Sequence, residues 1–342
     1  MTRALLVRSD AVGDLALTLP VARSIKQANP DMQLALLTSR YTAPMLAGEG
    51  YIDDIVTIPN RALSNMKEIT ALARDLGRMK VDTCVMFYPR LSLALAVYLA
   101  KIPVRIGTAR RAYSMLFNRR VNLHRRNSGK HELDLNYDLV ESSFPGLSRF
   151  EPSLTVTASE ADRAEAFLAE VGIDRDSRFI IVHPLSHGSS PNWRIEKYVE
   201  LVEKLAGDGH RIVITGSQLE ADDLARAFGS SGAFVINIAG KTDLALLKAI
   251  IHKATLLVSG STGPIHLAGA VGTFAVGIYP PESALSPVRW GPRGYANKLF
   301  LPAVNEYKGS SVDLMDMIAV QEVYEFIMAQ LSEKKNRKIG RE

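Results

Sequence analysis

The stretch LLVSGSTGPIHLAGA, residues 256–270, places an apolar run directly before small hydroxylated residues and glycines, which an Ala/Leu-rich segment follows. This order predicts a strand, a tight turn and a helix. Ser261 and Thr262 are of types favoured as helix N-caps, and Gly263 lets a ligand approach the backbone. The unpaired N–H groups of such a helix start suit a phosphate, with His266 about one turn further in. An ordinary strand-to-helix turn that binds nothing is the alternative.

Strands and helices alternate on both sides of this stretch. Further strands are expected at residues 4–8, 33–38, 55–59, 83–88, 104–107, 179–184, 211–215, 234–238 and 274–279, with helical patterns between them. A basic, poorly periodic segment at 110–129 predicts a long loop or a broken helix. Such alternation is typical of α/β proteins, in which helices cover both faces of a parallel sheet.

Length and composition favour two domains, because 342 residues of 47% hydrophobic composition can bury two ordinary cores. We expect an N-terminal domain at 1–152, a second domain at 153–310, a C-terminal helix at 311–333 and a basic tail at 334–342. The one cysteine, Cys84, excludes an intramolecular disulfide and lies in a predicted strand, which favours a place in the core. The composition therefore predicts a soluble protein of a reducing cytoplasm.

Positive charge is concentrated in the first half of the chain. Residues 1–150 hold 21 Lys/Arg and 13 Asp/Glu, a net charge of +8, whereas residues 151–342 hold 20 and 23, a net charge of −3. From Arg90 to Lys130 there are ten basic residues and no acidic one. Such a block indicates an anionic partner, which could be a phosphorylated or carboxylated sugar, a membrane surface or nucleic acid. A solvated basic face without a partner is the alternative.

Each strand predicted in the second half ends in a loop rich in Gly, Ser, Thr or Pro. Ligands of open α/β sheets bind beyond the carboxyl ends of the strands, so these loops predict a pocket. No Walker loop, G-x-G-x-x-G segment or G-x-S-x-G elbow occurs, which argues against a P-loop ATPase and weakens a nicotinamide hypothesis. The seven histidines lack metal-ligand spacing, so we expect no metal site and no cofactor.

Six motifs follow one another along the chain. They are R-x-x-x-x-G-D-x-x-x-x-x-P at 8–20, IPVRIG at 102–107, NW at 192–193, GSQLE at 216–220, IAGKT at 238–242 and STGPIHLA at 261–268. In this order and spacing the set resembles glycosyltransferase family 9, the bacterial heptosyltransferases. The resemblance covers almost the whole chain, and its motifs are more specific for the family than for the substrate.

The resemblance implies a GT-B fold, with two Rossmann-like domains facing a cleft and the C-terminal helix packing back on the first domain. It also implies an inverting, metal-independent transfer of heptose from ADP-heptose to the inner core of lipopolysaccharide. The expected partners are the nucleotide-sugar donor and an anionic lipid A–Kdo type acceptor, without nucleic acid. We therefore expect a cytoplasmic protein with peripheral contact at the inner face of the cytoplasmic membrane.

An inverting transfer needs a base for the acceptor hydroxyl, and the family aspartate matches Asp14. A plain charge at a helix N-terminus is the alternative for Asp14, and Asp10 is a local competitor. The residues expected to bind the donor are Ser189, Ser190, Asn192, Gly216, Glu220, Lys241, Thr242, Ser261, Thr262, Gly263 and His266. Those expected to bind the acceptor are Arg105, Arg110, Arg111, Arg119, Arg120, Arg125 and Arg126. For each serine a capped turn is the alternative, and any exposed helical glutamate would resemble Glu220.

Two positions depart from the family pattern. Ser261 stands where the family commonly has Asp, and Pro191 takes the place of a phosphate-binding Lys seen in many members. These departures leave the sugar and nucleotide of the donor open. The rival hypotheses are a member with another nucleotide-sugar donor, a GT-B sugar-nucleotide epimerase, and a nucleic-acid-binding α/β protein. Release of ADP that depends on the acceptor would distinguish them.

Overall fold

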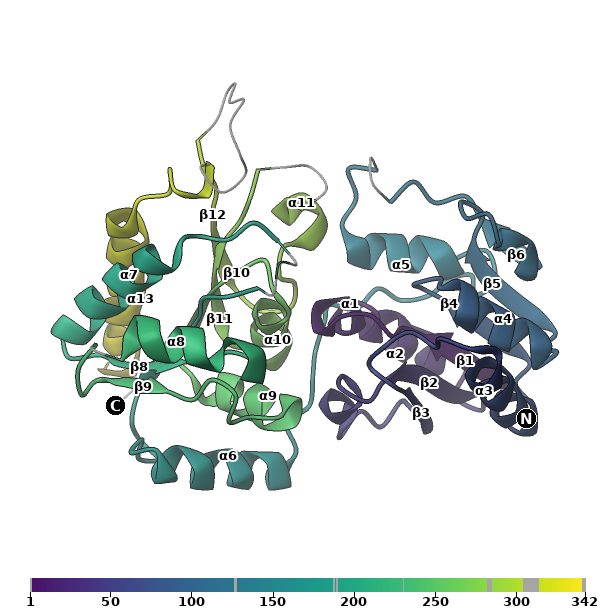
Figure 1. The fold of residues 1–342 in the computed structure, drawn as a ribbon, viewed down its shortest axis with the longest axis horizontal. Coiled ribbons are helices and arrows are strands. Elements are labelled where there is room, and N and C mark those ends of the chain that lie inside the picture. The colour runs from purple at the N-terminus through teal and green to yellow at the C-terminus, as the bar shows by residue number, and fades with distance from the viewer. Residues whose placement is uncertain are drawn as a thin grey trace. The chain divides into compact units, whose positions relative to one another are not determined.

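The computed structural model describes residues 2–125, 128–186, 188, 190–229, 231–281, 285–303 and 314–339, with the backbone alone described for 334–339. The chain divides into two compact units, Met1–Thr157 and Ala158–Glu342 (Figure 1). The sequence placed this boundary at residue 152. Residues up to 157 stay with the first unit because the Thr155 N–H donates to the Glu49 carboxylate at 2.6 Å.

The first unit is a six-stranded parallel sheet with the order β3-β2-β1-β4-β5-β6. Its strands are β1 (Arg3–Val7), β2 (Gln33–Ser39), β3 (Asp54–Ile58), β4 (Thr83–Met86), β5 (Val104–Thr108) and β6 (Arg119–Val121). Its helices are α1 (Val12–Ala16), α2 (Leu19–Ala28), α3 (Met66–Arg78), α4 (Leu91–Leu99) and α5 (Glu132–Val140), with short 3-10 turns η1 (Ala43–Leu46) and η2 (Ser114–Leu116).

The apolar runs of this sheet form its core as predicted. Leu5, Val7 and Cys84 are fully buried. Burial raises the pKa of the Cys84 thiol to about 12, which confirms the prediction that this residue belongs to the core.

Segment 110–129 was predicted as a loop or broken helix, and this prediction is wrong in part. The segment contains η2 and the short strand β6, which pairs with β5 through Ile106 and Arg119. The sequence did not indicate this strand, because it begins with two arginines and shows no alternation of apolar and polar residues. It lies at the edge of the sheet, where one side of the strand has no neighbouring strand and polar side chains are tolerated.

The second unit repeats the same plan, with the order β12-β11-β10-β7-β8-β9. Its strands are β7 (Phe179–His183), β8 (Arg211–Ile214), β9 (Val235–Asn237), β10 (Leu256–Gly260), β11 (Phe274–Ile278) and β12 (Asn297–Phe300). Its helices are α6 (Ala158–Glu170), α7 (Ile195–Gly207), α8 (Ala221–Phe228), α9 (Leu244–Lys253), α10 (Gly263–Val271), α11 (Pro287–Trp290) and α13 (Val320–Ile339), with the 3-10 turn η3 (Gln218–Glu220).

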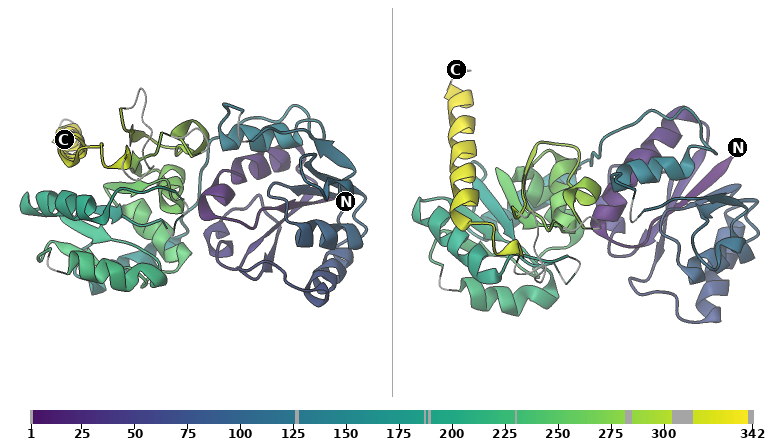
Figure 2. Two further views of the ribbon diagram at one scale, coloured as in Figure 1. Left: turned by 45° about the horizontal axis from the view of Figure 1, so that its top comes forward. Right: turned by 90° about the horizontal axis from the view of Figure 1, so that it is seen from above.

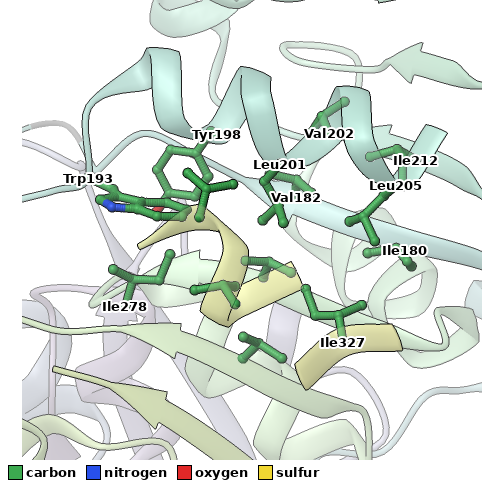
Figure 3. Packing of buried hydrophobic residues seen from close by; sticks show 14 of the residues in the cluster. Ile180, Val182, Trp193, Tyr198, Leu201, Val202, Leu205, Ile212, Ile278 and Ile327 are labelled. Atoms are coloured by element: carbon green, nitrogen blue, oxygen red, sulfur yellow. The ribbon is translucent and has the colours of Figure 1, made fainter. Parts of the chain in front are cut away.

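The C-terminal helix α13, which was predicted to pack on the first domain, belongs to the second unit. Its residues Val323 and Ile327 are fully buried in the core of the second unit, and both views of Figure 2 show α13 on the flank of that unit. Trp193 anchors the segment before the helix, because its Nε1 donates to the Ile318 carbonyl at 3.2 Å. Trp193 also packs edge to face on Tyr198, with ring centroids 5.3 Å apart (Figure 3).

Both sheets share one topology. Counted within each unit, the strand order is 3-2-1-4-5-6, the order of a doubly wound dinucleotide-binding fold. The order reverses between β1 and β4 in the first unit and between β7 and β10 in the second. Ligands of such sheets bind beyond the carboxyl ends of the strands at this reversal. The prediction of an α/β protein with parallel sheets is confirmed. Within the described ranges, no helix is long and apolar enough to cross a bilayer.

Candidate active site

Buried hydroxyl and imidazole groups connect the carboxyl ends of three strands of the second sheet. The Ser259 hydroxyl at the end of β10 donates to the carbonyl of His183, the last residue of β7, at 3.0 Å. The His183 ring lies 3.0 Å from the Thr215 hydroxyl, which follows β8. All three residues are buried. This polar row lies at the strand-order reversal, and it was not predicted.

Helix α10 begins at this row. Thr262 is its N-cap, as predicted, but the Thr262 side chain makes no capping bond because its hydroxyl lies 2.8 Å from that of Ser259. The first N–H groups of α10 are therefore not used by their cap residue. His266 is buried in the first turns of the same helix. A helix start of this kind, with adjacent hydroxyls, suits an anion.

The loop that follows β7 packs against the end of β10 through Asn192. Its amide nitrogen donates to the Pro184 carbonyl, and its amide oxygen accepts from the Tyr198 hydroxyl at 3.2 Å. A Cβ atom on Gly260 would lie 2.6 Å from that oxygen, so glycine is required for the two segments to approach. Ser190, also buried, donates to the Pro191 carbonyl at 3.2 Å. Asn192 thus shapes the loop, while Ser189 lies outside the described residues.

The next two loops, after β8 and β9, are packed on each other. Glu220 is buried and forms a capping box with Ser217: its Oε2 accepts from the Ser217 N–H at 2.8 Å, and the Ser217 side chain accepts from the Glu220 N–H. The Ser217 hydroxyl also donates to Oε2 at 2.9 Å. Gly240 has φ +75°, and a Cβ there would lie 2.7 Å from the Gln218 amide oxygen. Glu220 therefore has a structural task that its sequence pattern did not reveal.

These two loops contain three of the residues predicted to bind the nucleotide-sugar donor. Gly216 fits closely, because a Cβ there would lie 2.3 Å from a methyl group of Leu224. Lys241 is exposed and Thr242 is half-buried, directly after Gly240. The loops thus place an exposed cation and a half-buried hydroxyl next to the carboxyl edge of the second sheet.

Ser261, at the position where an aspartate was expected, hydrogen-bonds the side chain of Tyr279. The Tyr279 hydroxyl donates in turn to the Trp290 carbonyl at 2.9 Å. Burial raises the pKa of Tyr279, so the phenol stays neutral. Before the start of α10 the chain therefore carries the neutral hydroxyl of Ser261, bonded to that of Tyr279, where a carboxylate was expected.

A buried guanidinium organises the corresponding edge of the first sheet. Arg8 follows β1 directly and is 2% exposed. Its Nε lies 2.8 Å from the Asp10 carboxylate, its Nη2 pairs with Oδ1 of Asp14, and its Nη1 lies 3.6 Å from Glu132 of α5. Burial lowers the pKa of Arg8, whereas the neighbouring Asp10 raises it. One guanidinium thus contacts three carboxylates at the reversal between β1 and β4.

Asp14, the predicted base, is held through one of its two carboxylate oxygens. It lies in the first turn of α1, and its side chain is 18% exposed. Oδ1 is bound by Arg8, and no described residue donates a hydrogen bond to Oδ2. Asp10 is the geometric competitor, because it pairs with the same guanidinium and is 13% exposed.

The arginines of the basic block divide into two groups. Arg105 is held by backbone, because it donates to the Leu116 carbonyl at 2.8 Å and to the Ile102 carbonyl at 2.5 Å. Arg125 pairs with Glu132 and donates to the Phe87 carbonyl at 3.2 Å. The exposed members are Arg110, Arg111, Arg119 and Arg120. Arg126 lies outside the described residues. Of the predicted acceptor residues that the structure describes, these four lie on the surface, where an acceptor could reach them.

Metal-ligating side chains do not gather in the described part of the chain: no three His, Cys, Asp or Glu residues are placed there to hold an ion. His131 instead caps α5 by accepting from the Leu133 N–H at 3.1 Å. His124 lies 2.8 Å from the Arg110 guanidinium.

Comparison with known proteins gives consistent matches. The model of Glycosyltransferase family 9 (heptosyltransferase) matches residues 69–313. A Haemophilus influenzae protein named only provisionally as a glycosyltransferase is 26% identical over 330 residues, which cover 93% of this chain and 94% of that one. Lipopolysaccharide heptosyltransferase 3 of Escherichia coli K12 is 25% identical over 297 residues, 82% of each chain. The structure of E. coli ADP-heptose lipopolysaccharide heptosyltransferase II has a TM-score of 0.81 at 19% identity and covers 98% of this chain and 100% of that one, which confirms the GT-B fold class.

Proposed function

Because the chain belongs to glycosyltransferase family 9 and is therefore a glycosyltransferase, we propose that it moves a heptose from ADP-heptose to the inner core of lipopolysaccharide, with inversion. The names of two matched proteins, a lipopolysaccharide heptosyltransferase and an ADP-heptose heptosyltransferase, support this donor and this acceptor class.

The start of α10 is the observation that carries the proposal. Its first N–H groups are not capped by Thr262, and the buried row of Ser259 and His183 lies beside it. Departure of a diphosphate leaves negative charge on its oxygens, and fixed N–H groups at a helix start stabilise that charge. His266 in the same helix would contact the same diphosphate. The neighbouring loops, with Lys241 and Thr242, would bind the nucleoside.

Asp14 is the base of the proposed reaction. Its Oδ2 takes the proton of the acceptor hydroxyl while the hydroxyl oxygen bonds to the anomeric carbon of the donor. The bond from that carbon to the diphosphate oxygen breaks on the opposite face, and ADP leaves with the electron pair. Base assistance of this kind is worth roughly 10²–10⁴ in rate. No residue of the proposed pathway requires a metal ion, so activity should persist in EDTA.

The acceptor side of the proposal rests on the exposed arginines of the first unit. An inner-core acceptor carries Kdo carboxylates and phosphates, and a guanidinium can bind either group through two parallel hydrogen bonds. The same surface would bring the protein to the anionic inner face of the cytoplasmic membrane.

A second donor remains a candidate because of one observation. Ser261 pairs with Tyr279 where an aspartate was expected, which changes the charge beside the sugar diphosphate.

The test therefore supplies purified protein with ADP-heptose, and in parallel with other ADP- and UDP-sugars, with and without a Kdo₂–lipid A acceptor. We expect ADP release and a product heavier by one heptose only when ADP-heptose and acceptor are both present. Turnover with another sugar alone would favour the second candidate. Isomerisation of a donor without acceptor would indicate an epimerase instead.

A further inference from the structure

Arg8 lies in a cluster of buried and partly buried charges in the first unit. Two guanidinium groups, Arg8 and Arg125, lie among three carboxylates, Asp10, Asp14 and Glu132. Glu132 is 1% exposed and pairs with both guanidinium groups. A charge at this depth is costly unless it is paired, so the number and placement of the partners decide which carboxylate stays ionised.

We propose that Arg8 is a positioning residue that fixes Oδ1 of Asp14 and keeps its carboxylate ionised, and that Glu132 sets how strongly Arg8 does so. The proposal rests on the proposed function only in giving Asp14 its task as a base. It assigns no contact with substrate to Arg8 or Glu132.

The geometry supports a fixed orientation of Asp14. Arg8 reaches the Asn136 amide oxygen at 3.4 Å, and the Asn136 amide nitrogen donates to the Leu17 carbonyl at 3.0 Å. The guanidinium is therefore linked to α5 and to the residue that follows α1. Because Arg8 holds Oδ1, Asp14 can offer only Oδ2 to an acceptor.

Glu132 competes with Asp14 for the same positive charge. The carboxylates of both residues contact Arg8, and Arg125 offsets part of the charge on Glu132. Among the residues that the structure describes, Asp10 and Tyr88 are the other charged or titratable groups that face Arg8. Neutralising Glu132 would leave Arg8 more available to Asp14, whereas neutralising Arg8 would remove the cation that both Asp10 and Asp14 contact. The two changes should therefore move the ionisation of Asp14 in opposite directions.

Four variants test the proposal. Arg8→Gln removes the charge, Arg8→Lys keeps the charge but loses the planar fork, and Glu132→Gln removes the competitor. Asp134→Asn is the matched control, because Asp134 lies on α5 two residues from Glu132 but pairs with Arg149. Circular dichroism establishes which variants fold.

The first readout is the acidic limb of the kcat profile for acceptor-dependent ADP release. In Arg8→Gln the limb should move up by about 1–3 pH units, the usual effect of an adjacent arginine on an aspartate. In Glu132→Gln it should move down, and in Asp134→Asn it should stay in place. Arg8→Lys should keep the wild-type limb with a several-fold lower kcat, because orientation is lost while charge remains. A loss of kcat in Arg8→Gln that is uniform at every pH, or limb shifts of the same sign for Arg8→Gln and Glu132→Gln, would overturn the proposal.

The second readout does not depend on activity. Carbon-13 NMR of protein labelled at aspartate carboxyl groups gives the titration of Asp14, identified by the signal missing in Asp14→Asn. We expect the Asp14 signal to titrate at lower pH in Glu132→Gln than in wild type. If no donor is turned over but this shift appears, the proposed function fails and the inference stands. If transfer occurs and the signal does not move, the inference fails alone. Should Arg8→Gln not fold, Arg8→Lys and Glu132→Gln carry both readouts.

Discussion

Asp10 and Asp14 share one guanidinium, yet their tasks differ in the proposed reaction. Both carboxylates are partly exposed and both follow β1 within a few residues. The position in the G-D motif favours Asp14, and its Oδ2, to which no described residue donates a hydrogen bond, agrees with that preference. Local geometry alone would allow either residue to take a proton, so the base has to be identified by substituting each aspartate in turn.

The first prediction compares Asp14→Asn with Asp10→Asn. Asn at 14 keeps the size of the side chain but cannot accept a proton, so kcat should fall at least about 100-fold while the Kd for ADP stays unchanged. Asp10→Asn should retain most of its kcat. Steady-state kinetics and calorimetry with ADP provide the two measurements. If Asp10→Asn is the more damaging change, the base has been assigned to the wrong aspartate.

The second prediction concerns His266, which is buried in the first turns of α10. Its proposed partner is phosphate, so His266→Ala should weaken binding of ADP by roughly 10-fold, the effect of about one hydrogen bond to a charged group. Binding of adenosine should hardly change. Calorimetry with both ligands tests the difference. Equal losses for ADP and adenosine would return His266 to a purely structural role.

The residues that sequence reasoning missed share one property. Arg8, Glu132 and His183 act through contacts with residues far away in the chain, and Glu132 lies 124 positions from Arg8. Arg8 was visible as a charge at the end of an apolar strand and as the first letter of a motif. No pattern in the sequence, however, indicates that it is buried or which carboxylates surround it. The sequence also did not indicate that Glu220 belongs to a capping box, because a glutamate at this position is equally compatible with binding a ligand.

At the scale of elements, prediction succeeded where burial imposes a pattern. Strands β7, β10 and β11 are central and apolar on both faces, and the sequence predicted all three. Strands β6 and β12 were missed because edge strands tolerate polar residues. The C-terminal helix was predicted, but its docking partner was not. The apolar stripe of α13 is compatible with many surfaces, and its packing on α7 and in the core of the second unit selects one.

The third prediction concerns the start of α9. Asp243 caps this helix by accepting from the Leu246 N–H at 2.8 Å, and it pairs with Arg163 of α6 at 2.8 Å. Asp243→Ala should lower the free energy of unfolding by about 1 kcal/mol at pH 7. Asp243→Asn should lower it less, because asparagine is an equally good cap and only the exposed ion pair is lost. Urea unfolding measures both changes. Equal losses in the two variants would mean that the ion pair, and not the cap, stabilises α9.

The contribution of Asp243 should also depend on pH. Burial by itself would raise the pKa of Asp243, but the Leu246 N–H and Arg163 together lower it below its ordinary value. A carboxyl group with a lowered folded pKa stabilises the fold fully above its unfolded pKa of about 4. This contribution is lost as the pH falls through the folded pKa. The difference between wild type and Asp243→Asn should therefore shrink when unfolding is repeated near pH 3.

At the scale of the whole molecule, charge is divided between the two halves. The first 150 residues carry a net charge of +8 and the remainder −3. The structure reduces the number of arginines available for an acceptor, because Arg105 and Arg125 are held within the protein. The edge strand β6 presents Arg119 and Arg120 to solvent. These two are the best candidates for recognition of a lipid-linked anion.

The fourth prediction is that Arg119→Gln/Arg120→Gln raises the acceptor KM by up to roughly 30-fold and weakens its dependence on salt. Each exposed ionic contact contributes about 1 kcal/mol or less, and salt screens it. The donor KM should stay constant. Arg74→Gln/Arg78→Gln is the matched control, since it removes the same charge from exposed positions on α3. A rise in donor KM, or an equal effect of the control, would exclude a specific acceptor surface at β6.

Each sheet takes all six of its strands from one uninterrupted half of the chain. During translation, the ribosome therefore delivers β1 to β6 before the first residue of β7, Phe179, has been added. Because N-terminal domains generally fold first during synthesis, the first half can assemble while the second is still being made. A nascent chain at that stage already contains Arg8, Asp14 and Glu132. The carboxylate proposed as the base can thus be set in place co-translationally, before the half that is proposed to bind the nucleotide exists.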